Sequence, residues 1–119
     1  MKDGPLQKKS FAFAVRIVKL YKHLCDEKKE YVLSKQLLRS GTAIGALVRE
    51  AEQAESKPDF IHKMAIALKE ANEAEYWILL LLETGYLDAT EADTIVADNT
   101  ELLRLLTSII NTTKQRMAK

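Results

Sequence analysis

The sequence predicts an all-α protein that folds as an antiparallel, up-down-up-down bundle of four helices. Its 119 residues include four glycines and two prolines, and long stretches rich in Ala, Leu, Glu and Lys contain neither, which is typical of helices. Apolar residues recur at helical spacing in four segments joined by short polar links, and such links make successive helices antiparallel neighbours. A chain of this length forms one domain and buries a core without metals or disulfides.

Local signals place the ends of the helices. We expect a disordered lead over residues 1–4, and the rest of the chain, 5–119, as one domain with helices at about 5–30, 32–56, 59–84 and 89–117. Pro5 suits a first helical turn, and Pro58 restricts the residue before it to non-helical geometry. Gly85 suits a left-handed C-cap, and Asp88 followed by Glu91 has the spacing of a capping box.

The core is predicted from the apolar stripe of each helix, taken at about 100° per residue. Its members are Ile17, Leu24, Leu37, Ile44, Val48, Met64, Leu68, Ile78, Leu102, Leu106 and Ile109. Gly41 and Gly45 lie beside the stripe of the second helix, although an interior glycine costs about 1 kcal/mol relative to alanine. We therefore expect another helix to pack closely against them.

The third helix carries more apolar surface than one core can cover. In its C-terminal half apolar side chains occur almost all the way round, and a patch of this kind is rarely left open on a monomer. We therefore expect a homo-oligomer. Its predicted contact consists of Ile66, Trp77, Leu80 and Leu81.

Two long motifs carry a resemblance to a known family. The string RSGTAIGALVREA, followed by SKPDFIHKMAIALKEANEAEYW, resembles the signature of the S23 ribosomal protein-like four-helix bundle proteins encoded by intervening sequences of bacterial 23S ribosomal RNA. The resemblance extends from about Phe11 to Lys114. It departs from the commoner pattern at Ala43, where a serine is usual, and at Leu47, where an asparagine is frequent.

The resemblance implies a four-helix bundle assembled as a ring-like homopentamer, with no established enzymatic activity. The accessory variability proteins of diversity-generating retroelements resemble the same family. That second likeness implies a nucleic-acid partner, RNA or DNA, for the basic helices on the outside of such a ring.

Basic residues gather on one side of the first helix. Residues 5–30 contain seven Lys or Arg against three Asp or Glu, whereas residues 57–85 contain three against five. The formal net charge is only +1. A polyanion would therefore have to bind the side of the first helix where the basic residues gather. With no aromatic residue interleaved in the stripe, we expect contact with the nucleic-acid backbone and no base stacking. The candidate residues are Lys8, Lys9, Arg16, Lys19 and Lys22.

Two alternatives remain open for these surfaces. The basic side could be a solvated face that keeps the protein dissolved, in which case the protein is an assembly or scaffold module for another protein. Further polar residues could form ion pairs between helices or subunits, or line a ligand pocket. They are Arg39, Glu50, Lys69, Glu73 and Glu75. Glu75 falls within the core stripe, where a carboxylate needs a partner.

Several classes of function find no support in the sequence. A lone Cys25 cannot form an internal disulfide, and we expect it to be a buried thiol in a reducing compartment. Asp59 and His62 are the nearest approach to a di-iron motif, so we expect no metal and no cofactor. A P-loop, a dinucleotide fingerprint and a nucleophile elbow are missing, which predicts no enzyme. Neither a signal peptide nor a membrane span occurs, so we expect a cytoplasmic protein without a membrane partner.

Overall fold

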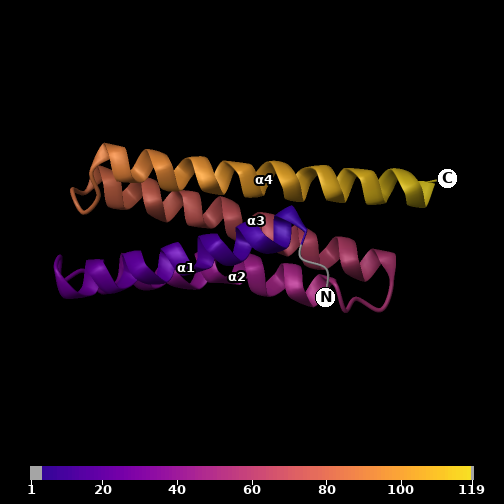
Figure 1. The fold of residues 1–119 in the computed structure, drawn as a ribbon, viewed down its shortest axis with the longest axis horizontal. Helices are drawn as coiled ribbons and strands as arrows, with labels where there is room; N and C mark the ends of the chain where they lie inside the picture. Colours follow the sequence, from indigo (N-terminus) through magenta and orange to yellow (C-terminus); the bar gives the residue numbers. More distant parts are fainter. Residues whose placement is uncertain (1–3, 119) are drawn as a thin grey trace.

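The computed structural model, which describes residues 4–118, consists of four long helices (Figure 1). They are α1 (Pro5–Asp26), α2 (Leu33–Ala51), α3 (Lys57–Glu83) and α4 (Ala89–Ala118). Successive helices run in opposite directions along a body of 52 × 21 × 21 Å. The predicted all-α, up-down-up-down bundle is confirmed. Three of the four residues of the expected N-terminal lead, 1–3, lie outside the described residues.

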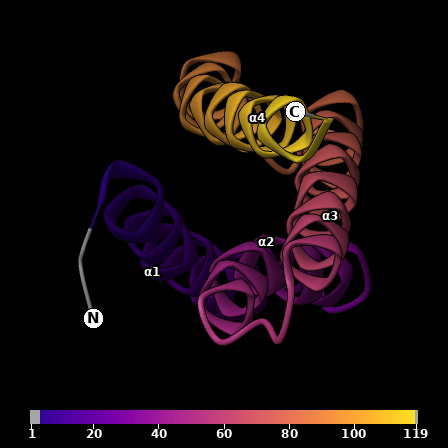
Figure 2. The same cartoon turned by 90° about the vertical axis from the view of Figure 1, so that its right-hand side faces the viewer.

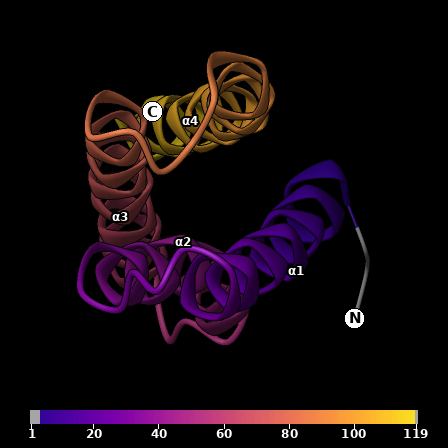
Figure 3. The ribbon, with the colours of Figure 1, turned by 90° about the vertical axis from the view of Figure 1, so that its left-hand side faces the viewer.

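The helices follow one another around the bundle in chain order (Figures 2 and 3). Viewed end-on, α2 lies between α1 and α3, and α3 lies between α2 and α4. The contact between α1 and α4 is the smallest of the four helix contacts. As a result, α1 exposes more of its surface than a helix enclosed on two sides would.

The core is close to the predicted one. Nine of the eleven predicted core residues are buried, while Leu68 and Ile109 are half-buried at its edge. On α3 the buried row is Met64, Ala67, Ala71, Ala74, Ile78 and Leu81. Three alanines fill its middle because α3 packs closely between two neighbours, which displaces larger side chains such as Leu68 to the flank.

The two glycines of α2 mark the close approach of α1, as predicted. A Cβ at Gly41 would lie 2.9 Å from Cγ1 of Ile17, and one at Gly45 would lie 3.3 Å from the backbone oxygen of Ser10. Both distances are shorter than ordinary van der Waals contact, so a larger residue would force the helices apart. The lack of a side chain at Gly41 and Gly45 therefore allows α1 to pack closely against α2.

The first link is longer than expected because α1 ends at Asp26, four residues before the predicted Glu30. Lys29 takes a left-handed conformation with φ of 55°. The Glu30 carboxylate then accepts hydrogen bonds from the backbone N–H groups of Val32, Leu33 and Ser34 at 3.1, 3.0 and 2.7 Å. Glu30 therefore caps the start of α2 and does not belong to α1.

The two remaining links match their local signals to different degrees. α3 begins at Lys57, two residues before the predicted position 59, so the prediction that Pro58 keeps Lys57 out of the helix is wrong, and Pro58 lies in the first turn. Before α3 the Ser56 hydroxyl accepts from the N–H of Asp59 at 3.2 Å, and the Asp88 carboxylate accepts from the N–H of Glu91 at 2.7 Å at the start of α4. Gly85, with φ of 86°, follows α3. The N–H of Tyr86 then donates to the carbonyl of Leu81 at 2.9 Å, the pattern of a Schellman motif. α2 ends at Ala51, five residues before the predicted Ser56.

Candidate nucleic-acid interface

The five predicted basic residues divide into two groups in the structure. Lys9 and Arg16 face α4. Arg16 donates through Nη1 to Oδ2 of Asp98 at 2.8 Å and through Nη2 to the hydroxyl of Thr94, while Lys9 forms an ion pair with Glu101. The side chains of Lys9 and Glu101 are half exposed. These two cations already have carboxylate partners within the chain.

The other three basic residues lie on the outer side of α1. Lys8, Lys19 and Lys22 are exposed, and no ion pair joins them to another residue within 4–118. At about 100° per residue they fall within an arc of about 60°. They form a row about 21 Å long, at 1.5 Å of rise per residue.

Two apolar side chains occupy the same outer row, which we call the α1 outer row: Lys8, Phe11, Val15, Lys19 and Lys22. Phe11 is 64% exposed and Val15 is 39% exposed. The expectation that the basic stripe contains no aromatic residue is therefore wrong, because Phe11 lies exposed within it. The spacing of three and four residues from Lys8 to Phe11 to Val15 was the available signal, because such positions share one face of a helix.

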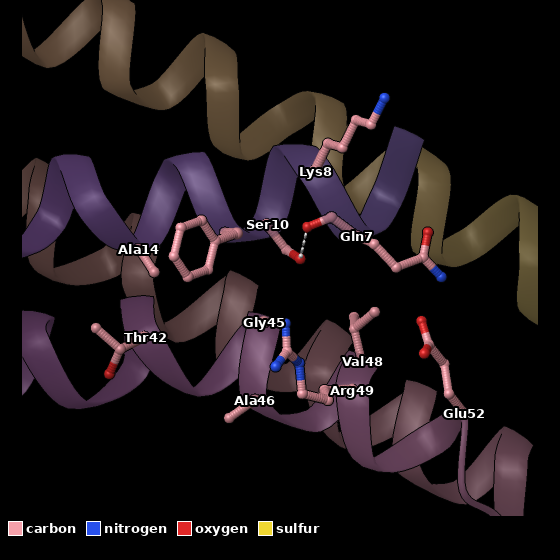
Figure 4. A pocket seen from close by; sticks show the side chains of 11 residues that line it. Gln7, Lys8, Ser10, Ala14, Thr42, Gly45, Ala46, Val48, Arg49 and Glu52 are labelled. Atoms are coloured by element: carbon pink, nitrogen blue, oxygen red, sulfur yellow. Dashed lines mark hydrogen bonds between the residues drawn. The ribbon is translucent and has the colours of Figure 1, made fainter. Parts of the chain in front are cut away.

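A groove of about 590 Å³ lies between α1 and α2 beside the N-terminal end of this row. Part of its lining consists of small residues, namely Ser10, Ala14, Gly45 and Ala46. Figure 4 shows Gln7 and Glu52 extending toward each other across the space between the two helices, whereas Arg49 lies over α2 in this view and Lys8 points away from that space. The remaining lining residues are Lys8, Phe11, Thr42 and Val48.

One polar atom at this groove is left without a partner. Oε1 of Glu52 is shielded from solvent and accepts no hydrogen bond from any described residue. A buried acceptor of this kind is costly unless a donor reaches it. The groove is thus lined by the aromatic Phe11, by the cations Lys8 and Arg49, and by an acceptor without a partner.

The predicted oligomer contact is only partly at the surface. Leu81 is fully buried in the core, with 0% exposure, so the structure removes it from any contact between intact chains. Ile66, Trp77 and Leu80 are half-buried.

Two exposed apolar side chains of α3 lie next to Trp77 and Leu80 in the chain. Tyr76 is 59% exposed and Leu79 is 45% exposed. The rings of Tyr76 and Trp77 meet edge to face at 5.1 Å, and the indole N–H of Trp77 is buried without an acceptor among the described residues. The outer side of the C-terminal half of α3 is therefore the apolar surface that its own bundle leaves uncovered.

The predicted polar residues on α2 and α3 do not form one network. Glu50 pairs with Lys63 at 3.2 Å, a partner that the sequence analysis did not name. Arg39 and Glu73 line a polar groove of about 530 Å³ together with Glu70. Lys69 is exposed, and no ion pair joins it to another residue of 4–118.

The two carboxylates Glu70 and Glu75 differ in their surroundings. Partial burial, with the nearby charge of Glu73, raises the pKa of Glu70 despite the opposing charges of Lys69 and Arg39. Glu75 is half-buried at the edge of the core row and forms no ion pair with another described residue. Within the described residues Glu75 therefore has no charged partner, and a pairing between subunits or a place in a ligand pocket stays a prediction.

The structure offers no sign of a metal centre or a membrane span in its described part. Among residues 4–118, no three His, Cys, Asp or Glu side chains come close enough together to hold a metal ion. No helix between residues 4 and 118 is both long enough and apolar enough to cross a membrane. Cys25 is half-buried and unpaired.

Comparison with known proteins agrees with this architecture. None of the curated proteins matches the chain. A crystal structure of a protein with unknown function from the S23 ribosomal protein family of Bacteroides thetaiotaomicron is similar, with 59% sequence identity and a TM-score of 0.88. The match covers 88% of this chain and 97% of that one. The family model of the 23S rRNA-intervening sequence protein matches residues 2–108, and the chain belongs to that family.

Proposed function

We propose that the protein is a non-enzymatic, self-associating bundle that holds the backbone of RNA or DNA along the α1 outer row. The observation that carries the proposal is the position of Lys8, Lys19 and Lys22. All three are exposed on one side of one helix, and none has a carboxylate partner within residues 4–118. The resemblance to 23S rRNA-intervening sequence proteins supports a role close to nucleic acid.

The length of the row fits a short stretch of polymer. A row of about 21 Å spans roughly six nucleotides at the rise of 3.4 Å per nucleotide that a strand has within a duplex. Three contacts in one chain bind weakly, but an oligomer repeats the row, and linked weak contacts act together. By resemblance, the assembly is a ring of five.

The decisive experiment removes the three lysines and measures binding at several salt concentrations. Wild-type protein should bind a labelled single strand at about 50 mM salt, and log Kd should rise with log salt with a slope of about 0.7 per phosphate contact. The triple substitution Lys8→Gln, Lys19→Gln and Lys22→Gln should abolish retention at that salt. Fluorescence anisotropy provides the affinities.

A matched triple substitution controls for net charge. Lys35, Lys57 and Lys69 are exposed lysines on α2 and α3, so changing all three to Gln removes the same charge from other faces. That variant should bind nearly as well as wild type. Equal loss in both variants would assign binding to net charge alone, and absence of binding by wild type would leave the protein as an assembly module for another protein.

A further inference from the structure

We propose that the groove between α1 and α2 takes an unpaired nucleobase, which stacks on Phe11. The inference rests on the proposed function and sharpens it, because a site of this kind selects single-stranded nucleic acid over duplex. It adds to backbone contact a binding site for the base itself.

The first support is the exposure and surroundings of Phe11. Phe11 leaves 64% of its surface exposed to water, so it contributes little of the free energy that a buried phenylalanine gives to folding. Phe11 lies on the same outer row as Lys8, and both residues line the groove. An aromatic ring beside a cation is the arrangement by which single-strand binding proteins stack a base and hold the adjacent phosphate.

The second support is the chemistry of the groove. Its volume of about 590 Å³ leaves room for a flat ring. Its small residues, including Ala14, Gly45 and Ala46, keep that space open. Gln7 extends into it, and Arg49 lines it from the α2 side (Figure 4).

Two of the lining groups complement particular parts of a nucleotide. Arg49 adds a cation that suits a phosphate, and the unpartnered Oε1 of Glu52 can accept a hydrogen bond from the edge of a base. A base pair in a duplex offers no free Watson–Crick edge to such a groove. The groove therefore fits a base that is unstacked and unpaired.

The test compares one strand with its duplex. Wild-type protein and Phe11→Leu, which keeps an apolar side chain but removes the ring, are titrated with labelled oligothymidylate of about 20 nucleotides and with duplex DNA of the same length. Phe11→Leu should weaken single-strand binding about 10-fold and leave duplex binding unchanged. Tyr31→Leu is the control, because Tyr31 is also exposed, at 56%, and does not line the groove.

A second measurement needs no variant. Ultraviolet cross-linking of oligothymidylate to the wild-type protein, followed by peptide mass spectrometry, should place cross-links on the segment that contains Phe11. Cross-links that fall only on other segments overturn the inference. So does a Phe11→Leu variant that binds the single strand as tightly as wild type.

The remaining outcomes separate this inference from the proposed function. Equal loss of single-strand and duplex binding in Phe11→Leu overturns stacking while backbone binding stands. If Phe11→Leu changes the particle mass but not single-strand binding, the groove is a contact between copies of the chain and the inference fails. Failure of the wild-type protein to bind either probe overturns the proposed function and this inference together.

Discussion

At the scale of single residues, Glu30 shows how one carboxylate replaces a conventional N-cap. Burial by itself raises the pKa of Glu30, but the backbone hydrogen bonds from Ser34, Leu33 and Val32 outweigh it and hold the pKa below its ordinary value. The Ser34 hydroxyl in turn donates to the Glu30 carbonyl at 2.8 Å. The first turn of α2 thus depends on the charged form of Glu30.

This dependence predicts a pH-sensitive loss of stability in Glu30→Gln. The amide replaces one acceptor oxygen with a donor, which should cost about 1 kcal/mol near neutral pH, as for a lost cap. Because the folded pKa is lowered, the contribution of Glu30 is present above its unfolded pKa of about 4.3 and disappears as pH falls through the folded value. The difference between variant and wild type should therefore shrink under acid conditions.

Urea denaturation followed by circular dichroism, at pH 7 and at about pH 3, checks this expectation. Glu27→Gln is the control, because Glu27 is an exposed carboxylate in the same link. A difference between Glu30→Gln and wild type that is the same at both pH values would show that shape, and not charge, matters at this position.

At the scale of the helices, the contact between α1 and α4 is unusual because charged pairs join its outer edge. Arg16 with Asp98 and Lys9 with Glu101 connect the two helices, whose contact is the smallest of the four helix contacts. Exposed ion pairs contribute at most about 1 kcal/mol each. These pairs therefore add little to the stability of the fold, and they place carboxylates beside two of the five candidate cations.

Releasing these cations should strengthen polyanion binding. In the double variant Asp98→Asn and Glu101→Gln, Lys9 and Arg16 become available to phosphates, which should raise single-strand affinity. The slope of log Kd against log salt should increase by about 0.7 for each added contact. Stability in urea should change by no more than about 2 kcal/mol, since both pairs are exposed.

A second double variant on α4 isolates the effect of these two pairs. Glu91→Gln with Asp93→Asn makes the same charge change at exposed positions of α4 that form no ion pair with the rest of residues 4–118. It should raise affinity only slightly and leave the slope unchanged. An equal gain in both variants would mean that general repulsion, and not occupation of Lys9 and Arg16, limits binding.

These two scales also show how far the sequence could predict the structure. Periodicity found the four helices and most of the core, because each helix must bury one stripe. Periodicity assigned Leu81 to the oligomer contact, whereas the side chain is buried in the core. The angles of the residues on one helix do not show whether neighbouring helices pack on one side of it or on two. The buried row of Ala67, Ala71 and Ala74 on α3 could not be predicted from the sequence, because it depends on how the neighbouring helices pack against α3.

The candidate site, like the fold, was predictable from the sequence only in part. The charged residues of α1 were found, but the division between Lys9 and Arg16 on one side and the α1 outer row on the other depends on where α4 lies. That position is a long-range property, with Arg16 and Asp98 separated by 82 residues in the chain. Exposure of Phe11 likewise depends on how α2 packs beside it, because Phe11 lines the groove between α1 and α2.

At the scale of the whole molecule, two of the apolar surfaces that stay exposed within residues 4–118 belong to different helices. One is the outer side of α3, with Tyr76 and Leu79 exposed and the N–H of Trp77 buried without an acceptor. The other includes Phe11 on α1. If the α1 surface binds nucleic acid, then self-association falls to α3, where a neighbouring chain can cover apolar area and supply the missing acceptor.

The assembly prediction follows from this division. Wild-type protein should form particles much larger than one 13.5 kDa chain at micromolar concentration, with a pentamer expected by resemblance. Tyr76→Glu places a charge at a position that is 59% exposed in the single chain, so the fold should tolerate it while the contact does not. Light scattering should therefore show a smaller particle, and circular dichroism should show unchanged helix content.

Phe11→Glu is the matched change on α1 and should leave the particle mass unaltered, because Phe11 is equally a surface aromatic but belongs to the other apolar surface. If Phe11→Glu dissociates the particle and Tyr76→Glu does not, the contact between chains lies on α1, and the α1 outer row is then hidden from nucleic acid in the assembly. A wild-type particle with the mass of one chain would refute self-association itself.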